Sequence, residues 1–461
     1  MNYITNLYTP QLEKIHSGKV RESFRIDEAT RVIVATDRLS SFDKVLETPI
    51  PGKGAILNQL SAYWFEATRD IIDNHFIQLI DPNISLVKEV TPIRLEMIVR
   101  SYLSGSMLRN YNHGVRTFSG VKVPDGMKKH QKFPELLVTP TTKEKSDREI
   151  SPKEIVAGGW TDEKTYGLMA EVSKKLFTRA QDVLFEKGLI LVDTKYEFGL
   201  LNDRLILMDE IHTPDSSRFW YREEYEKDPE NVAQMDKEFV RSYLLKNKVN
   251  GEYPTTLPEE IVAETIKRYQ ELYERITGVK SSPIESDIES RIYRNLVNAK
   301  LINDGYIAII MGSKADAEHC LMMKSQIERY GVRAFLRVMS AHKNGEDVVE
   351  KITDYNHSVE PGAVIAVAGL SNGLGGALGA NLSIPVINCP PFKDQLDMYL
   401  NINSSLLMPS KTPAATVIRA ESAVAVALRS LNLHRLRNTF RDEIKEIKRS
   451  LREDDENVNK L

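Results

Sequence analysis

Residues 193–218 read DTKYEFGLLNDRLILMDEIHTPDSSR, and the N-terminal half of the chain is organised around this stretch. The pattern predicts two strands joined at Asn202-Asp203, followed by a loop rich in groups that hold anions and metals. Asp193, Lys195 and Glu197 alternate along the first strand, so their side chains point to one face.

The length of the hairpin loop decides whether Glu197 meets Asp209. A three-residue loop centred on Asp203 sets Asp209 opposite Glu197, whereas a two-residue loop puts the two on opposite faces, and we adopt the three-residue loop. Two facing carboxylates beside a lysine suit Mg²⁺ carried by a nucleoside triphosphate. The alternative is a solvated hairpin face. Apolar flanks at 189–192 and 205–208 argue against it, because unpaired carboxylates in a buried sheet are costly.

Length and composition narrow the class of protein. The 461 residues predict two or three domains, and 41% hydrophobic with 28% charged residues is typical of a soluble globular chain. A net charge of −3 gives no bulk attraction to nucleic acid or to an anionic membrane. The chain shows no signal peptide in residues 1–12, no membrane-length apolar run and only two cysteines, so we expect a cytoplasmic protein without nucleic-acid or membrane partners.

Other N-terminal motifs carry charge beside small residues. SGKVR at 17–21 places Lys19 and Arg21 on one side of a glycine turn that phosphate can approach. PGKG at 51–54 opens a predicted helix, and helix starts favour anions. In the predicted strand at 91–103, Arg94, Glu96 and Arg100 can share a face, although a salt-bridged edge strand is an equal alternative. The polar stretch 139–147 is interpreted as a substrate loop.

These motifs together resemble the phosphoribosylaminoimidazole-succinocarboxamide synthases over about residues 1–279. The residues that carry the resemblance are SGKVR at 17–21, ATDRLSSFD at 35–43, Arg100 with SGS at 104–106, DTKYEFG at 193–199 and DSSR at 215–218. The resemblance implies an α+β, kinase-like ATP-binding fold that joins a carboxylate to the amine of L-aspartate. Such chemistry proceeds through an acyl phosphate, which positioning and charge neutralisation promote.

The same resemblance implies roles for individual residues. Lys19 and Arg21 would hold the ATP phosphates, and Glu197 and Asp209 would hold Mg²⁺. Substrate would be bound by Arg100, Ser106, Asp215 and Arg218, with Lys195 as a catalytic residue. Glu22 stands where the family usually has Asp, so its arm is one methylene longer.

The C-terminal half predicts a doubly wound parallel sheet. Apolar strands at 306–311, 333–339, 363–368 and 384–389 are each followed by a polar or Pro-rich turn, namely GSKAD at 312–316, SAHK at 340–343, GLSNGLGG at 369–376 and the prolines 390–391. Such turns meet at the carboxyl ends of parallel strands, where sites form. A lone His342 is more often structural, but its place at a strand end beside two polar loops favours a proton carrier.

This half resembles the phosphoribosylaminoimidazole carboxylases over about residues 305–430, in the animal-type form that uses CO₂, because Lys343 follows His342 and Ser371-Asn372 is present. The fold implied is flavodoxin-like. The resemblance implies that His342 moves a proton with Lys343 beside it, and that substrate is bound by Gly312, Ser313, Asp316, Ser340, Ser371 and Asn372. Ala315 and Leu370 replace an expected Ser and Arg, and each replacement removes a polar contact.

We therefore predict a synthetase domain at 1–279, a linker at 280–304 marked by Gly278 and by SSP at 281–283, a carboxylase domain at 305–430 and a helical tail at 431–461. The expected activity is bifunctional. Aminoimidazole ribotide would be carboxylated with CO₂ and then coupled to L-aspartate, with ATP and Mg²⁺. The carboxylase resemblance and an apolar stripe on the tail imply a homo-octamer built through the C-terminal domain. Two alternatives stay open: a synthetase with an inactive carboxylase-like scaffold, and a kinase-like nucleotide-binding regulator.

Overall fold

The computed structural model describes residues 2–42, 44–144, 147–281 and 286–459, and the chain forms two compact units. One unit comprises Met1–Asn6 and Lys14–Ile292, and the other comprises Leu7–Glu13 and Tyr293–Leu461. Asp43, Lys145, Ser146, Ser282 and Pro283, which belong to motifs named above, lie outside the described ranges. The boundary falls inside helix α8 (Ile288–Asn298), so the predicted linker 280–304 contains a helix.

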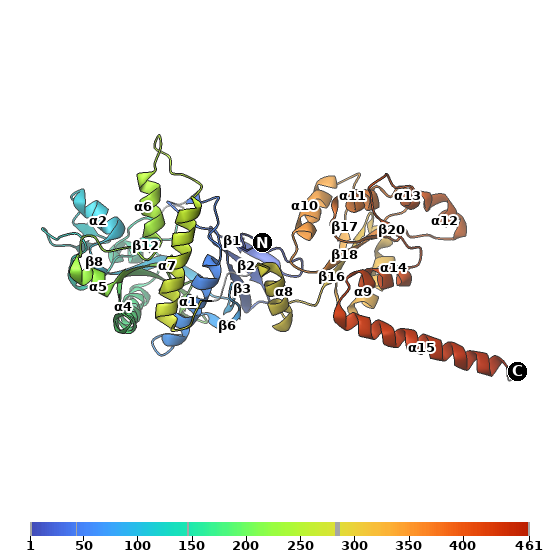
Figure 1. Cartoon of the computed structure of the whole chain (residues 1–461), viewed down its shortest axis with the longest axis horizontal. Helices are drawn as coiled ribbons and strands as arrows, with labels where there is room; N and C mark the ends of the chain where they lie inside the picture. The colour runs from blue at the N-terminus through green and yellow to red at the C-terminus, as the bar shows by residue number, and fades with distance from the viewer. Residues whose placement is uncertain (1, 43, 145–146, 282–285, 460–461) are drawn as a thin grey trace. The chain divides into compact units, whose positions relative to one another are not determined.

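The first sheet of the N-terminal unit has five strands in the order β1-β2-β3-β7-β6, and helix α1 packs against it (Figure 1). Gly18 N donates to Arg21 O at 2.8 Å and closes the turn between β1 and β2, which carries Lys19. The bounds are β1 Glu13–Ser17, β2 Arg21–Arg25, β3 Thr30–Ala35, β6 Phe76–Asp81, β7 Ile84–Lys88 and α1 Lys53–Ala67.

The second sheet is built around β13, which pairs antiparallel with β8, β14 and β15. The apolar residues 189–192 at the start of β13 are buried, as their character predicts. The bounds are β8 Thr91–Tyr102, β11 Lys132–Val138, β12 Thr141–Thr142, β13 Leu189–Leu201, β14 Arg204–Met208 and β15 Ser217–Tyr221. Two short ladders complete the strands: β4 Ser40–Ser41 with β5 Lys44–Val45, and β9 Thr117–Phe118 with β10 Val121–Lys122.

The predicted three-residue hairpin loop is wrong. Leu201 pairs with Arg204, so the loop has two residues, and Glu197 lies opposite Met208 rather than Asp209. Asn202 and Asp203 both have positive φ, 50° and 59°, as a two-residue turn of the hairpin type requires. Asp209 follows the strand with φ 67°, outside the alternation of β14. The chain therefore turns at Asp209. Strand alternation would put Asp209 and Glu197 on opposite faces after a two-residue loop, but Asp209 no longer follows that alternation.

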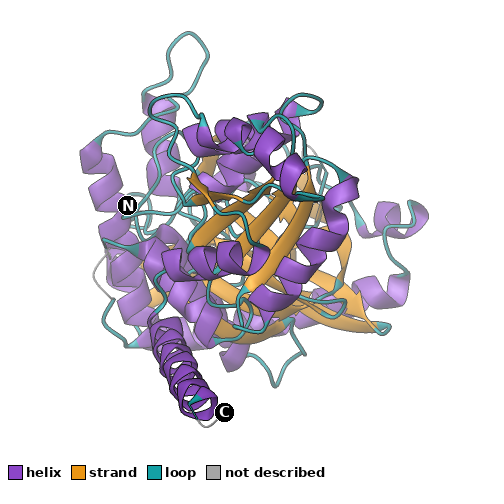
Figure 2. Cartoon of the chain, turned by 90° about the vertical axis from the view of Figure 1, so that its right-hand side faces the viewer, coloured by secondary structure: helices purple, strands orange, loops and turns teal. Residues whose placement is uncertain are grey.

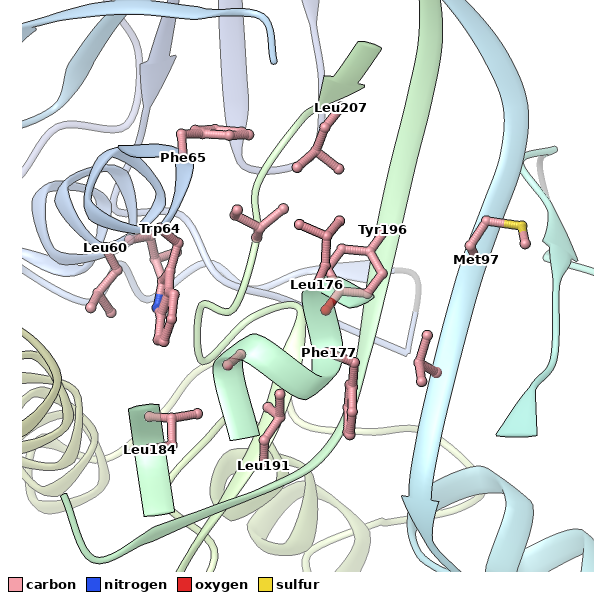
Figure 3. Packing of buried hydrophobic residues seen from close by; sticks show 14 of the residues in the cluster. Leu60, Trp64, Phe65, Met97, Leu176, Phe177, Leu184, Leu191, Tyr196 and Leu207 are labelled. Carbon is pink, nitrogen blue, oxygen red and sulfur yellow. The ribbon is translucent and has the colours of Figure 1, made fainter. Parts of the chain in front are cut away.

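Helix α4 (Glu163–Glu186) packs against β13 and β8 of this sheet, and α1 belongs to the same hydrophobic core. Leu60, Trp64 and Phe65 of α1 meet Leu176, Phe177 and Leu184 of α4 over strand residues such as Tyr196 and Leu207 (Figure 3). Burying each leucine contributes about 1.5–3 kcal/mol, so this layer holds β13 rigidly. The remaining helices of the unit are α2 Gly105–Asn112, α3 Pro152–Ala157, α5 Arg222–Lys227, α6 Glu238–Lys246 and α7 Glu259–Thr277.

The C-terminal unit contains five parallel strands in the order β17-β16-β18-β19-β20, the flavodoxin-like order, which confirms the predicted doubly wound sheet. Alternate residues of β16 point to the two faces of this sheet. Ile307 and Ile309 pack towards α9 and α14, and Ala308 and Ile310 towards α10 and α11. The bounds are β16 Tyr306–Met311, β17 Arg333–Val338, β18 Gly362–Val367, β19 Val386–Asn388 and β20 Ala415–Thr416. The helical segments are η1 Lys314–Asp316, α9 Ala317–Glu328, α10 Gly345–Asn356, α11 Gly373–Asn381, α12 Gln395–Asn401, α13 Asn403–Leu406, α14 Ala420–Ser430 and α15 His434–Val458.

The N-terminal segment Leu7–Glu13 packs with the C-terminal unit, which the sequence did not predict. Gln11 exchanges hydrogen bonds of 2.9 Å with the backbone of Asn303, and it donates to Glu360 at 2.6 Å. Thr9 also bonds Glu360, whose carboxylate is buried.

Helix α15 forms the predicted tail and extends away from the body of its unit to the C-terminus (Figures 1 and 2). Its first apolar residues, Leu436 and Phe440, are buried, but Ile447 and Leu451 are 60% and 63% exposed. Among the described residues, no helix is both long enough and apolar enough to cross a membrane.

Candidate active sites

A cavity of about 680 Å³ in the N-terminal unit gathers most of the predicted synthetase residues. It is lined by Lys19, Arg100, Ser106, Asp193, Lys195, Asp215 and Arg218. The β13 residues reach it because alternation puts Asp193 and Lys195 on one face, as predicted.

Next to the cavity, carboxylates and lysines form one cluster. Glu96 of β8 pairs in register with Glu197 of β13, and Lys195 Nζ donates to Glu96 Oε1 at 2.5 Å and to Glu197 Oε1 at 3.1 Å. Lys143, from the predicted substrate loop, also bonds Glu197. Burial alone would lower the pKa of Lys195, but Glu197 and Glu96 outweigh it and raise that pKa well above its ordinary value.

Glu197 and Asp209 are close despite the register error, and their protonation is coupled. Burial, followed by the charge of Asp209, raises the pKa of Glu197 to about 7. Burial opposes ionisation of Asp209, yet the Arg21 guanidinium, with Lys143 and Lys195, holds the pKa of Asp209 far below its ordinary value. The pair therefore carries one firm negative charge and one carboxyl that ionises near neutrality.

Arg21 does not line the large cavity. It bonds Asp209, and its second terminal nitrogen lies 2.6 Å from Glu210 Oε1. Lys19, two residues earlier, does line the cavity, so the structure separates the two predicted phosphate ligands. Glu22 is fully buried beside Lys14, whose Nζ donates to Glu22 Oε1 at 3.1 Å.

Two arginines converge on Asp193 at the other end of the cavity. Arg218 NH1 donates to both Asp193 oxygens at 2.8 and 2.9 Å, and Arg100 NH1 lies 3.8 Å from Asp193 Oδ2. Gly105 has φ +59°, and a Cβ placed there would lie 2.4 Å from the Arg218 guanidinium. The glycine therefore lets the start of α2, with Ser106, approach this arginine.

In the coupling reaction that the sequence resemblance implies, Gly105→Ala is expected to displace Arg218 and to raise the KM for the ribotide by about 10–100-fold, because small misplacements of a binding group are costly. Steady-state kinetics with varied ribotide would measure this. Gly114→Ala is the matched control, since Gly114 also has positive φ but an added Cβ meets nothing within 4 Å. An equal KM increase in both variants would contradict the proposed clash.

Asp215 is buried between two lysines that the sequence analysis did not assign. Its Oδ2 lies 2.8 Å from Lys53 Nζ and 3.8 Å from Lys237 Nζ, and Tyr269 donates to Oδ1 at 3.0 Å. Burial lowers the pKa of Lys237 to about 8. Lys53 belongs to the PGKG motif and could have been found there, whereas Lys237 sits in a charged run without a distinguishing pattern.

The C-terminal unit holds a cavity of about 1040 Å³ at the carboxyl ends of its parallel strands. It is lined by Gly312, Ser313, Asp316, Ser340, His342, Lys343 and Ser371, together with Ala315 and Leu370. The imidazole of His342 rests against Gly373, where an added Cβ would lie 2.7 Å from Nε2.

Asn372 does not line this cavity. Its Oδ1 accepts from Gly375 N at 2.8 Å and caps α11, and its Nδ2 donates to Ser405 Oγ at 2.9 Å. These two bonds shape the loop, and the substrate-binding role of Asn372 stays a prediction.

Comparison with known families agrees with this arrangement. The SAICAR synthetase family model matches residues 14–256, more than half of the chain. The chain belongs to the SAICAR synthetase family. The AIR carboxylase model matches residues 306–454, so the SAICAR synthetase unit is followed by an AIR carboxylase domain, and the chain carries both domains of a bifunctional purine-biosynthesis enzyme.

Individual relatives of the SAICAR synthetase unit are similar over their whole length. A phosphoribosylaminoimidazole-succinocarboxamide synthase of Bacteroides fragilis is 44% identical over 303 residues, which cover 64% of this chain and 96% of that protein. The corresponding protein of Flavobacterium psychrophilum is 42% identical over 310 residues, 64% of this chain and 98% of its own. The structure of the Saccharomyces cerevisiae SAICAR synthase complexed with SAICAR aligns with TM-score 0.55 at 36% identity, over 61% of this chain and all of that one.

Proposed function

We propose that this chain carboxylates aminoimidazole ribotide with CO₂ in its C-terminal unit and couples the product to L-aspartate with ATP in its N-terminal unit. The observation that carries the proposal is that each family match falls on a unit whose large cavity is lined by the motif residues. The product of the first reaction is the substrate of the second, which gives the fusion a chemical logic. We place the enzyme in the cytoplasm.

In the coupling reaction, a carboxylate oxygen takes the γ-phosphoryl group of ATP and ADP leaves. The aspartate amine then attacks the acyl carbon, loses a proton and displaces phosphate. Lys19 faces the phosphates, Arg21 orients Asp209, and Lys195 offsets charge beside the reacting carboxylate. Arg100, Ser106 and Arg218 hold the ribotide, with Asp215 on the cavity wall.

Mg²⁺ fits the donor set. In the described residues, no three His, Cys, Asp or Glu side chains form a complete metal cage, and Mg²⁺ bound with a nucleotide needs only one or two carboxylates plus phosphates. Glu197 and Asp209 would hold the ion, and it would neutralise phosphate charge. The coupled pair retains one firm negative charge for this purpose.

In the carboxylation, the nucleophilic ring carbon of the ribotide bonds to the carbon of CO₂, and the proton on that ring carbon must then leave. His342 accepts this proton, and Lys343 supplies positive charge near the new carboxylate. Ser340 and Ser371 line the same cavity as hydroxyl donors.

A second candidate, an inactive scaffold, is favoured by one observation. Ala315 and Leu370 line the carboxylase cavity where the family resemblance expects Ser and Arg, and Leu370 is 79% exposed. Assaying the two half-reactions separately on the purified chain decides between them. Bicarbonate-dependent carboxylation supports the bifunctional enzyme, and coupling without any carboxylation at saturating bicarbonate supports the scaffold.

We further propose a homo-octamer built through the C-terminal unit. That unit exposes large apolar side chains on α12, α13 and α15, including Leu396, Leu400, Leu406, Ile447 and Leu451. Light scattering at micromolar concentration is expected to give about eight times the 52.4 kDa chain mass. A monomeric mass would contradict the proposal.

A further inference from the structure

A second histidine lines the C-terminal cavity. His319 lies on α9, three residues after Asp316 and four after Ala315, and all three residues line the cavity. Residues three and four apart on a helical segment share a side, so the imidazole stands one turn beyond the turn that begins at Gly312.

A cysteine directly after β19 contacts this imidazole. Cys389 is fully buried, and its Sγ lies 3.8 Å from Nε2 of His319. Burial raises the pKa of the Cys389 thiol to about 12, so the thiol keeps its proton and can donate it to an unprotonated Nε2. In that tautomer the ring proton of His319 is on Nδ1.

The ring is neutral near pH 7. Burial lowers the pKa of His319, against the opposing charges of Asp316 and Glu421. Among the described residues, His319 makes no hydrogen bond other than the Cys389 contact. A neutral imidazole whose Nε2 accepts from Cys389 has one N–H to donate, on Nδ1.

The turn at residues 312–316, next to His319, has no side-chain hydroxyl at position 315, and the His319 imidazole can supply a donor in its place. Ala315 has no hydroxyl, and the hydroxyl oxygen of Ser313 accepts from Ala315 N at 3.2 Å, as a cap of η1. Ser313 keeps its own O–H to donate, so an anion at this turn has that single hydroxyl and the backbone N–H groups unless a nearby side chain contributes.

We propose that His319 binds the phosphoribosyl group of the ribotide, donating from Nδ1 in the place of the hydroxyl that Ala315 lacks. Cys389 is a positioning residue, because it acts through the tautomer of His319. This assignment rests on the proposed carboxylase function, since it needs the ribotide in this cavity.

The test is steady-state carboxylation by the full-length protein at saturating bicarbonate with varied aminoimidazole ribotide. His319→Leu removes the donor and is expected to raise KM about tenfold, with kcat within about twofold. His319→Asn places an amide N–H near the Nδ1 position and should restore most of the affinity.

Ala315→Ser should lower KM more in the His319→Leu background than in the parent. His434→Asn, on an exposed residue at the start of α15, should change nothing.

The cysteine gives an independent readout. Cys389→Ser keeps a donor to Nε2 and should retain the parent KM, whereas Cys389→Ala should raise it. An unchanged KM in His319→Leu, or a lost kcat at unchanged KM, would overturn the assignment and leave the carboxylase function standing. A parent protein that neither carboxylates nor binds the ribotide by calorimetry would overturn the carboxylase function itself.

Discussion

Glu197→Gln is expected to reduce succinocarboxamide formation by about 10²–10³-fold while carboxylation continues at the parent rate. The change removes a charge but little volume, so the fold should persist. It also leaves Lys143 and Lys195, which both pair with the Glu197 carboxylate in the parent, beside a neutral amide. The nucleotide-bound Mg²⁺ would lose one of its two protein carboxylates. Following ADP release with supplied carboxylated ribotide and aspartate measures the effect.

Glu186→Gln is the matched control, because Glu186 is exposed at the end of α4, away from the cavity. Near-parent coupling by Glu197→Gln would show that the metal assignment is wrong. In the parent, the apparent Mg²⁺ affinity should fall as pH drops below about 7, since Glu197 then takes up a proton that competes with the metal. That pH dependence should be absent in Glu197→Gln.

The sequence predicted the face of β13 that carries the site because strand alternation is a local rule. Asp193 and Lys195 line the cavity, and the buried apolar flanks force the strand into the sheet. The hairpin register was mispredicted because the residues around Asn202-Asp203 are compatible with both a two-residue and a three-residue loop. The positive φ values of Asn202 and Asp203 in the structure identify the two-residue loop. Asp209 still reaches Glu197, because a further positive φ at Asp209 takes it out of the strand alternation.

Contacts between residues far apart in the chain could not be predicted from local sequence patterns. The Lys53–Asp215 ion pair joins residues from two distant motifs, and the Cys389–His319 contact joins the residue after β19 to helix α9. Nothing local predicts that segment Leu7–Glu13 packs with the C-terminal unit, because its hydrogen bonds to Asn303 and Glu360 depend on tertiary structure. That most of the predicted strand-end residues of the C-terminal unit line one cavity was predictable, since strand ends of a parallel sheet meet at one edge. The helix-capping contact of Asn372 was not predictable, because an asparagine in a loop can bind a ligand or cap a helix equally well.

His342→Asn is expected to lower carboxylation by about 10²–10⁴-fold and to leave coupling intact when carboxylated ribotide is supplied. The imidazole stands in the cavity with Ser340 and Ser371, and the Gly373 backbone beside it fixes its position. Asparagine approximates its size and keeps a hydrogen-bonding group, but it cannot take up a proton near neutral pH. Ribotide binding, measured by calorimetry, should therefore change little while incorporation of labelled bicarbonate collapses. Carboxylation that survives within about tenfold of the parent would remove His342 as the proton carrier, because a proton-transfer group contributes at least about a hundredfold.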